Sequence, residues 1–108
     1  MIFCFRLLIL LFVTSLLACT MQEVRLGEEL EQKGDWDGAI NAYRDALRKQ
    51  PFNKEIEQKY EEVKTKSAEQ HFSRGREWLK EGKLAEALQE FQVALGLDPQ
   101  KPEHHTAL

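Results

Sequence analysis

The sequence has few of the residues from which chemical sites are built. Its two cysteines are Cys4 and Cys19, and two of its three histidines, His104 and His105, are adjacent near the end of the chain. No cysteines and histidines have the spacing of a zinc site, no glycine-rich segment matches a phosphate-binding loop, and no serine, histidine and acid are grouped for nucleophilic catalysis. Adjacent histidines on a helix point about 100° apart, so we interpret His104 and His105 as exposed tail residues. We expect no enzyme activity, metal site, cofactor or small-molecule substrate.

An excess of positive charge is also lacking. The chain carries 15 lysines and arginines against 18 acidic residues, a formal net charge of −3. A nucleic-acid-binding surface needs clustered lysines and arginines that displace phosphate counterions, and no basic stripe is present. We therefore exclude nucleic acid as a partner. The length of 108 residues suits one small domain.

Helix-breaking residues are rare in the middle of the chain. No proline occurs between residues 52 and 98, and Gly75 is the only glycine between residues 53 and 81. Apolar and small residues recur there about three or four apart: Ile56, Tyr60, Val63, Ser67, Phe72, Gly75 and Leu79. We predict one long helix over residues 53–81. The alternative is a break near Thr65–Ser67, because threonine and serine are poorer helix formers.

An internal repeat surrounds this helix. Residues 34–51 and 82–99 match in register at one glycine, two alanines, one leucine and one proline, and both carry an aromatic residue at the tenth place. Gly34 and Gly82 suit helix ends at which the backbone adopts a positive φ. Apolar residues at spacings of three and four follow each glycine. Each copy therefore predicts a turn and then a helix, with Asp35 as a plausible N-cap in the first.

The repeat resembles the tetratricopeptide repeat, a helix–turn–helix unit of 34 residues. The family's small residue, two alanines, aromatic residue and closing proline fall on both copies: Gly27, Ala39, Tyr43, Ala46 and Pro51, then Gly75, Ala87, Phe91, Ala94 and Pro99. Glu23 and His71 stand at the family's early tryptophan position, so the first helices match less closely than the second. The resemblance implies an all-α fold of helical hairpins and a role in protein binding.

The resemblance also divides the chain. It places one repeat at residues 20–53, with its first helix at 23–33, and a second repeat at residues 68–101. The two copies are 48 residues apart, where the family's period is 34, so we assign residues 54–67 to a helical insertion. The insertion is close to a whole number of helical turns and keeps one helix face. We expect two hairpins that share the long central helix, with residues 102–108 as a partial cap.

The first residues are of a different kind. The segment Met1–Arg6 carries one positive side chain, and an almost unbroken apolar run extends from Leu7 to Leu17. A short cationic start, an apolar run of this length and a small residue before a cleavage point are typical of a secretory signal peptide. We predict a signal peptide at residues 1–18 and the helical domain at residues 19–108. The arginine stays cytoplasmic, so the domain lies on the other side of the membrane.

The end of this segment, Leu16-Leu17-Ala18-Cys19, resembles the lipobox of bacterial lipoproteins. The resemblance implies a diacylglyceryl thioether on Cys19 and cleavage after Ala18, which exposes an amine for a further acyl chain. Thr20 follows the cysteine in place of an aspartate, which by the usual sorting preference of lipoproteins favours the periplasmic face of the outer membrane. The alternative is an uncleaved transmembrane anchor, for which the segment is barely long enough because about 20 apolar residues are needed.

A partner surface is implied by the family as well. Its first helices line a concave groove that receives peptide segments. The groove-facing positions are Phe72, Arg76 and Leu79 in the second repeat and Val24, Glu28 and Glu31 in the first. We take Phe72, Arg76 and Leu79 as candidate partner-binding residues; a solvated face or self-packing is the alternative. The lysines and asparagines with which the family's basic clamp holds a terminal carboxylate are absent at these positions.

Two functional hypotheses arise from the sequence. The first is a membrane-anchored tetratricopeptide lipoprotein that serves as a protein–protein interaction or scaffolding module in the bacterial cell envelope. The second is an N-terminal anchoring and spacer region, or an accessory subunit, of a secretion or pilus channel component. Both predict a protein partner in the envelope and attachment to the membrane through Cys19.

Overall fold

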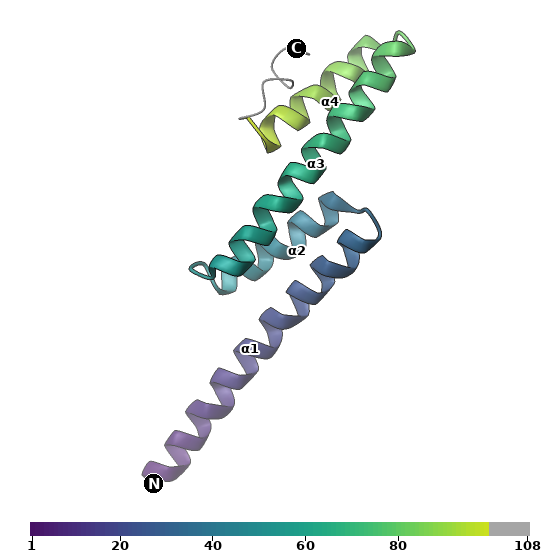
Figure 1. The fold of residues 1–108 in the computed structure, drawn as a ribbon. Coiled ribbons are helices and arrows are strands. Elements are labelled where there is room, and N and C mark those ends of the chain that lie inside the picture. Colours follow the sequence, from purple (N-terminus) through teal and green to yellow (C-terminus); the bar gives the residue numbers. More distant parts are fainter. Residues whose placement is uncertain (100–108) are drawn as a thin grey trace. The chain divides into compact units, whose positions relative to one another are not determined.

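A computed structural model describes residues 1–99, except for the side chains of residues 16–19. Over these residues the chain forms four helices and no strand: α1 (Ile2–Gln32), α2 (Trp36–Lys49), α3 (Lys54–Lys80) and α4 (Leu84–Leu97) (Figure 1). The predicted all-α class is confirmed. The expected partial cap, with His104 and His105, lies outside the described residues, and so does the side chain of Cys19.

The turns within the two hairpins have the geometry that their glycines predict. Gly34 between α1 and α2 has φ 73°, and Gly82 between α3 and α4 has φ 77°. Other residues rarely adopt this left-handed conformation. After Gly34, the Oδ1 of Asp35 accepts a hydrogen bond of 2.9 Å from the backbone N–H of Gly38, so Asp35 caps α2 as predicted. At the matching place before α4, Lys83 makes no side-chain cap, and its Nζ lies 4.3 Å from the centroid of the Trp78 ring.

The chain forms two compact units, residues 1–60 and the residues from 61 onward. In the first unit α1 and α2 pack as an antiparallel pair, which we call hairpin one (Figure 1). Its buried apolar residues are Ala39, Ile40, Ala42, Tyr43, Ala46 and Ile56. In the second unit the later part of α3 pairs with α4, which we call hairpin two, and Ala68, Ala87, Phe91 and Ala94 are buried there. The repeat alanines therefore lie in the core of each hairpin.

The central helix is continuous. α3 runs from Lys54 to Lys80 without interruption, as predicted for residues 53–81. The alternative of a break near Thr65–Ser67 is wrong, because those residues are helical and Ser67 is fully buried. Favourable packing at this position outweighs the weaker helix propensity of serine and threonine.

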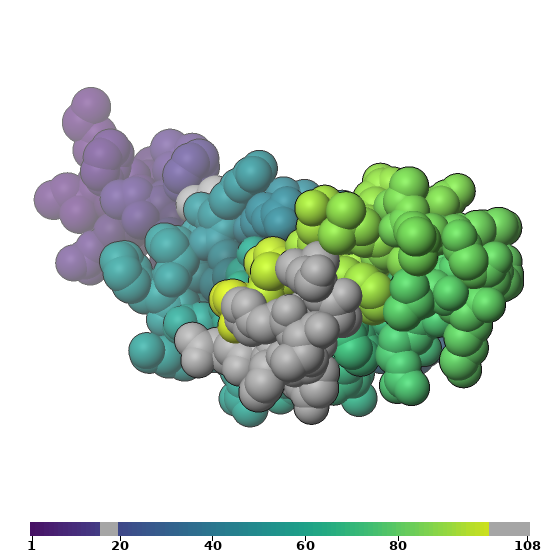
Figure 2. Space-filling view, turned by 90° about the horizontal axis from the view of Figure 1, so that it is seen from above, coloured from purple at the N-terminus to yellow at the C-terminus, as the bar shows by residue number. Residues whose placement is uncertain are grey.

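The first helix is longer than expected. The helix predicted at residues 23–33 is the last part of α1, which begins at Ile2 and includes the whole apolar run. No proline or glycine separates the run from the helix that follows it, so helical geometry continues through Thr20 and Met21. α1 is long and apolar enough to cross a membrane, a property that secretory signal sequences share. Its first side chains are exposed and stand clear of the rest of hairpin one (Figure 2).

Candidate protein-interaction surface

Hairpin two is built around Phe91. A Cβ added to Gly75 of α3 would lie 2.7 Å from the Cε1 of Phe91, so the ring packs directly on the glycine backbone. Phe72, one turn earlier on α3, contacts the same ring with 5.5 Å between centroids and an interplanar angle of 48°. Phe91 is buried by these contacts, whereas Phe72 is half-buried.

A polar contact fixes α3 and α4 beside this apolar centre. The Nδ1 of His71 lies 2.5 Å from the Oε2 of Glu90, and the Nη1 of Arg74 lies 3.6 Å from the other carboxylate oxygen. His71 is buried, and Glu90 precedes Phe91 on α4. This hydrogen-bonded group orients α4 on α3, so that Phe91 points toward Phe72 and Gly75.

The three predicted partner-binding residues share one stripe of α3 because they are four and three residues apart. Phe72 is partly occupied by its contact with Phe91. Arg76 is exposed, and Leu79 is 49% exposed. Phe72 therefore supports the core of hairpin two as well as its surface, while Arg76 and Leu79 are accessible.

The structure shows two further exposed leucines in hairpin two that the sequence interpretation missed. Leu84 is 67% exposed and Leu88 is 45% exposed. They precede Phe91 by seven and three residues, so they lie on the side of α4 that carries the Phe91 ring toward Phe72. We call Phe72, Leu79, Leu84 and Leu88 the hairpin-two face. The sequence interpretation sought the partner surface on the first helix of each repeat, which is why these leucines of the second helix were not considered.

The internal repeat shows what is unusual about this face. Leu84 and Leu88 of hairpin two occupy the repeat positions of Trp36 and Ile40 in hairpin one. Ile40 is only 4% exposed and Trp36 is half-buried. In hairpin one, α2 is followed by α3, whose Ile56 is also buried. The same two repeat positions are thus less exposed in the first copy than in the second.

The three residues predicted to face the groove in the first repeat do not all lie at one site. Val24 and Glu28 line a hollow of about 410 Å³ between α1 and the start of α3, together with Thr20, Met21, Arg25, Gln50, Asn53, Glu55, Ile56 and Lys59. Lys59 closes one side of it with an ion pair of 3.0 Å to Glu28, which raises the pKa of Lys59 chiefly through this hydrogen bond. Glu31 lies elsewhere and accepts a hydrogen bond of 2.6 Å from the hydroxyl of Tyr43.

Within residues 1–99, no three histidine, cysteine, aspartate or glutamate side chains are grouped in a way that could hold a metal ion. Cys4 is an exposed thiol on the first turn of α1. The features that distinguish the described part of the chain are therefore its helical hairpins and their exposed apolar residues.

A comparison with known protein families finds a match over the first hairpin. The family model described as "Tetratricopeptide repeat" matches residues 24–57. Residues 24–57 are thus similar in sequence to one tetratricopeptide repeat. The matched span covers the end of α1, all of α2 and the first turn of α3, and it begins and ends slightly later than the predicted span of 20–53. A search of curated proteins gives no match.

The tetratricopeptide match fits the contacts in both hairpins. The glycine and the aromatic residue that the family pairs across its two helices are Gly27 and Tyr43 in hairpin one, and a Cβ on Gly27 would lie 2.6 Å from the ring. Gly75 and Phe91 repeat this contact in hairpin two. The matched repeat suggests a protein–protein interaction module.

Proposed function

We propose that this chain is a membrane-anchored tetratricopeptide lipoprotein that holds a protein partner in the bacterial cell envelope. The observation that carries the proposal is the exposure of Leu84 and Leu88 on the hairpin-two face, whose repeat equivalents in hairpin one, Trp36 and Ile40, are less exposed. An exposed cluster of large apolar side chains on a repeat protein marks an interaction site. The apolar run before Cys19 supplies the attachment.

The internal repeat also suggests the chemistry of the partner. In hairpin one, a helix with an apolar residue at Ile56 follows α2 and is buried against the unit. We expect the partner to present an amphipathic helix with apolar residues at spacings of three and four, which would fill the face as a following helix does. Arg76 borders the face and favours an acidic residue beside that stripe.

The second candidate is an anchoring and spacer region, or an accessory subunit, of a secretion or pilus channel component. The continuity of α1 from Ile2 to Gln32 supports it, because a rigid helix joins the apolar run directly to the repeat. The two candidates differ in what the hairpin-two face contacts. A spacer would contact only its own assembly, whereas a scaffold would exchange partners.

A site-specific cross-linking experiment tests the proposal. A photoreactive amino acid is placed at Leu84 or Leu88 of the full chain in intact cells, with exposed Gln89 as the matched control position. We expect adducts with another envelope protein from positions 84 and 88 and not from 89, joined to a peptide with the spacing of an amphipathic helix. Leu88→Glu should abolish the adduct formed at position 84.

The other outcomes contradict specific parts of the proposal. Cross-links that stay within one chain would show that another segment of this protein covers the face. Equal yields from all three positions would show that the face has no specific occupant. The proposed outer-membrane location is tested separately by density-gradient fractionation of envelopes, in which the protein should sediment with outer-membrane markers.

A further inference from the structure

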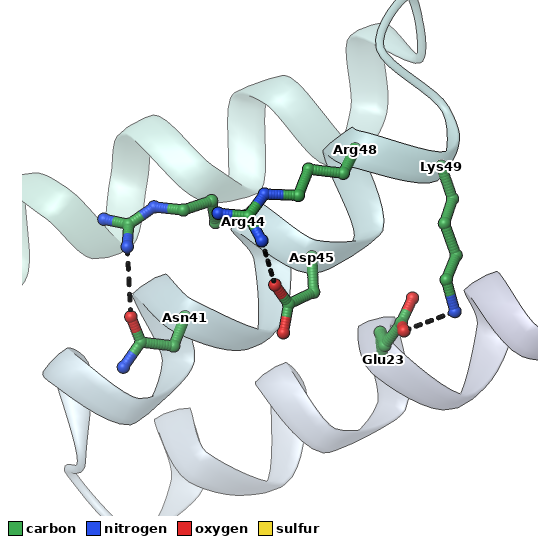
Figure 3. Close-up of polar contacts among 6 residues, drawn as sticks. All are labelled: Glu23, Asn41, Arg44, Asp45, Arg48 and Lys49. Atoms are coloured by element: carbon green, nitrogen blue, oxygen red, sulfur yellow. Dashed lines mark hydrogen bonds and ion pairs between the residues drawn. The ribbon is translucent and has the colours of Figure 1, made fainter.

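The turn between α2 and α3 lies beside the point where the apolar run of α1 ends. The Nζ of Lys49, at the end of α2, lies 2.5 Å from the Oε1 of Glu23 (Figure 3). Gln50 and Asn53 of the turn line the same hollow as Thr20 and Met21. All these residues belong to the first compact unit. The turn is therefore held next to the residues that directly follow Cys19.

This turn is hydrogen-bonded and exposes an aromatic ring. The Oδ1 of Asn53 accepts backbone hydrogen bonds from Glu55 and Ile56, which caps α3, and its amide donates to the Oε1 of Gln50 at 2.8 Å. Between the two capped ends, Phe52 is 92% exposed. Because these hydrogen bonds hold the backbone on the C-terminal side of Phe52, entry of the ring into another medium costs less backbone entropy than it would in an unstructured loop.

The distance to the membrane is set by helix geometry. If the apolar run is retained, Thr20 and Met21 lie about 5 Å beyond its last residue, Leu17, on a helix that rises 1.5 Å per residue. If the run is cleaved, the same two residues directly follow the acylated Cys19. The polar region of a bilayer is roughly 5–8 Å thick on each side of the hydrocarbon core. The turn beside these residues thus falls within the headgroup layer of the bilayer that holds the anchor.

We propose that the α2–α3 turn is a membrane-contact surface, with Phe52 inserted into the headgroup region of the same bilayer that holds the N-terminal anchor. The proposal rests on the anchoring proposed above. Exposed Met21 adds a second apolar side chain at this end of hairpin one. Phe52 contacts lipid whether the N-terminal segment is a cleaved signal peptide or an uncleaved anchor. This contact orients hairpin one so that the Gly34 turn is directed away from the membrane.

The charges around the turn indicate apolar insertion and not attraction to anionic lipids. The Nη1 of Arg48 lies 3.5 Å from the Oδ1 of Asp45 (Figure 3). The Nζ of Lys54 lies 3.9 Å from the Oε2 of Glu57. Arg48 and Lys54 thus each have an acidic neighbour on their own helix, and Lys49 pairs with Glu23 of α1, which reduces the positive field at the turn. We expect the contact to withstand salt and to depend on the ring of Phe52.

The test measures the depth of position 52 in vesicles. The full chain, extracted from bacterial membranes in a Cys4→Ser background, carries Phe52→Cys labelled with an environment-sensitive fluorophore and is reconstituted into phosphatidylethanolamine–phosphatidylglycerol vesicles. The matched control is Lys33→Cys, in the exposed turn at the other end of hairpin one and about 20 Å further along α1. The Cys4→Ser chain without an added cysteine measures any label on Cys19. We expect nitroxide-labelled lipids to quench the probe at position 52 at least threefold more than the probe at position 33, at both low and high salt.

The outcomes separate this inference from the anchoring on which it depends. If the protein does not float with vesicles, the anchoring fails. If it floats and the two probes are quenched equally, the anchoring stands and the contact of Phe52 is overturned. Quenching at position 52 that disappears in high salt would overturn apolar insertion.

A second measurement avoids the fluorophore, which is itself apolar. Trypsin cleavage after Lys49 and Lys54 of the unlabelled chain in vesicles is compared with cleavage after Lys33 in the same molecule. We expect Phe52→Asp to speed cleavage at the first two sites several-fold and leave the third unchanged. The substitution is at an exposed position, so the thermal midpoint should stay constant. Unchanged cleavage in Phe52→Asp would overturn the proposal.

Discussion

The ring of Tyr43 lies against the backbone of Gly27, so close that a Cβ on the glycine would stand 2.6 Å from the Cε1 of the tyrosine. The contact joins α2 to α1 at the centre of hairpin one, where Tyr43 is fully buried and its hydroxyl donates to Glu31. Gly75 and Phe91 make the same contact in hairpin two. In each hairpin a helical glycine thus sets how closely two helices approach.

The first prediction is that Gly27→Ala and Gly75→Ala destabilise the protein. Alanine favours a helix over glycine by about 1 kcal/mol, but overpacking a rigid aromatic ring costs about 1–3 kcal/mol. The added Cβ would lie only 2.6–2.7 Å from ring atoms, and the rings lack room to retreat in a buried site. The change in stability is therefore a loss. Urea unfolding should show a lower midpoint for both variants.

Gly96→Ala is the matched control. Gly96 also lies in a helix, α4, but among residues 1–99 no atom outside the backbone of its own helix lies within 4 Å of where its Cβ would stand. This substitution should leave stability unchanged or raise it by up to about 1 kcal/mol. If all three variants unfold at the same urea concentration, the close glycine–aromatic contacts do not exist.

The repeat contacts could be predicted from the sequence because they depend on residue type at fixed spacing. Gly27, Tyr43, Gly75 and Phe91 match the family's pattern, and Gly34 and Gly82 are the residues that a positive φ requires. The continuity of α3 was predictable for the same reason, since no helix breaker interrupts its apolar stripe.

The open surface could not be predicted in this way. Leu88 and Ile40 are aliphatic residues at the same repeat position, yet one is 45% exposed and the other 4% exposed. Periodicity shows which side of a helix is apolar, but whether that side is covered depends on which other elements pack against it. The position of Phe52 beside the end of the apolar run was also hidden, because it results from the antiparallel packing of α1 and α2.

The second prediction concerns alkaline pH. The hydrogen bond with Glu28 raises the pKa of Lys59 above its ordinary value of 10.5, so the folded state favours the charged lysine. This stabilisation is fully present below pH 10.5 and is lost as the pH rises through the raised pKa. Because both side chains are partly exposed, we expect only about 0.2–1 kcal/mol.

A double-mutant cycle of Lys59→Met and Glu28→Gln measures this contribution. Urea unfolding at pH 8 should show a coupling between the two residues that weakens at a higher pH, as the pH rises through the raised pKa of Lys59. A coupling that is unchanged at the higher pH would contradict the assigned ion pair. The unfolding free energies of the two single variants also show whether the packing around the hollow between α1 and α3 depends on this ion pair.

The third prediction is that Lys64→Pro disrupts α3. Proline removes the hydrogen bond to the carbonyl of Tyr60 and clashes with that carbonyl, which costs about 3 kcal/mol or more inside a helix. Amide exchange should accelerate in the part of α3 before the substitution and in α2. The residues around Gly75 and Phe91 should retain most of their protection, since their contacts lie within hairpin two. Lys64→Ala is the control and should change exchange little; uniform exchange in Lys64→Pro would show that the helix already opens there.

The last prediction is that Cys19 carries the membrane anchor. The segment Leu16-Leu17-Ala18-Cys19 has the lipobox arrangement, and the apolar run before it belongs to a helix long enough to reach across a membrane. Intact-mass measurement of the envelope-extracted protein should give a chain that begins at Cys19 with added acyl mass. Several acyl chains should hold it firmly, because each buried methylene contributes about 0.8 kcal/mol and a single chain binds only marginally.

Cys19→Ala should accumulate the unprocessed precursor, whereas the matched Cys4→Ala variant should be processed normally, since Cys4 lies in the segment that is removed. A mature chain that retains Met1 and an unmodified Cys19 would instead make α1 an uncleaved anchor. In that case the tetratricopeptide hairpin would be joined to the membrane by one continuous helix, and the position of Phe52 at the bilayer surface would depend on helix geometry alone.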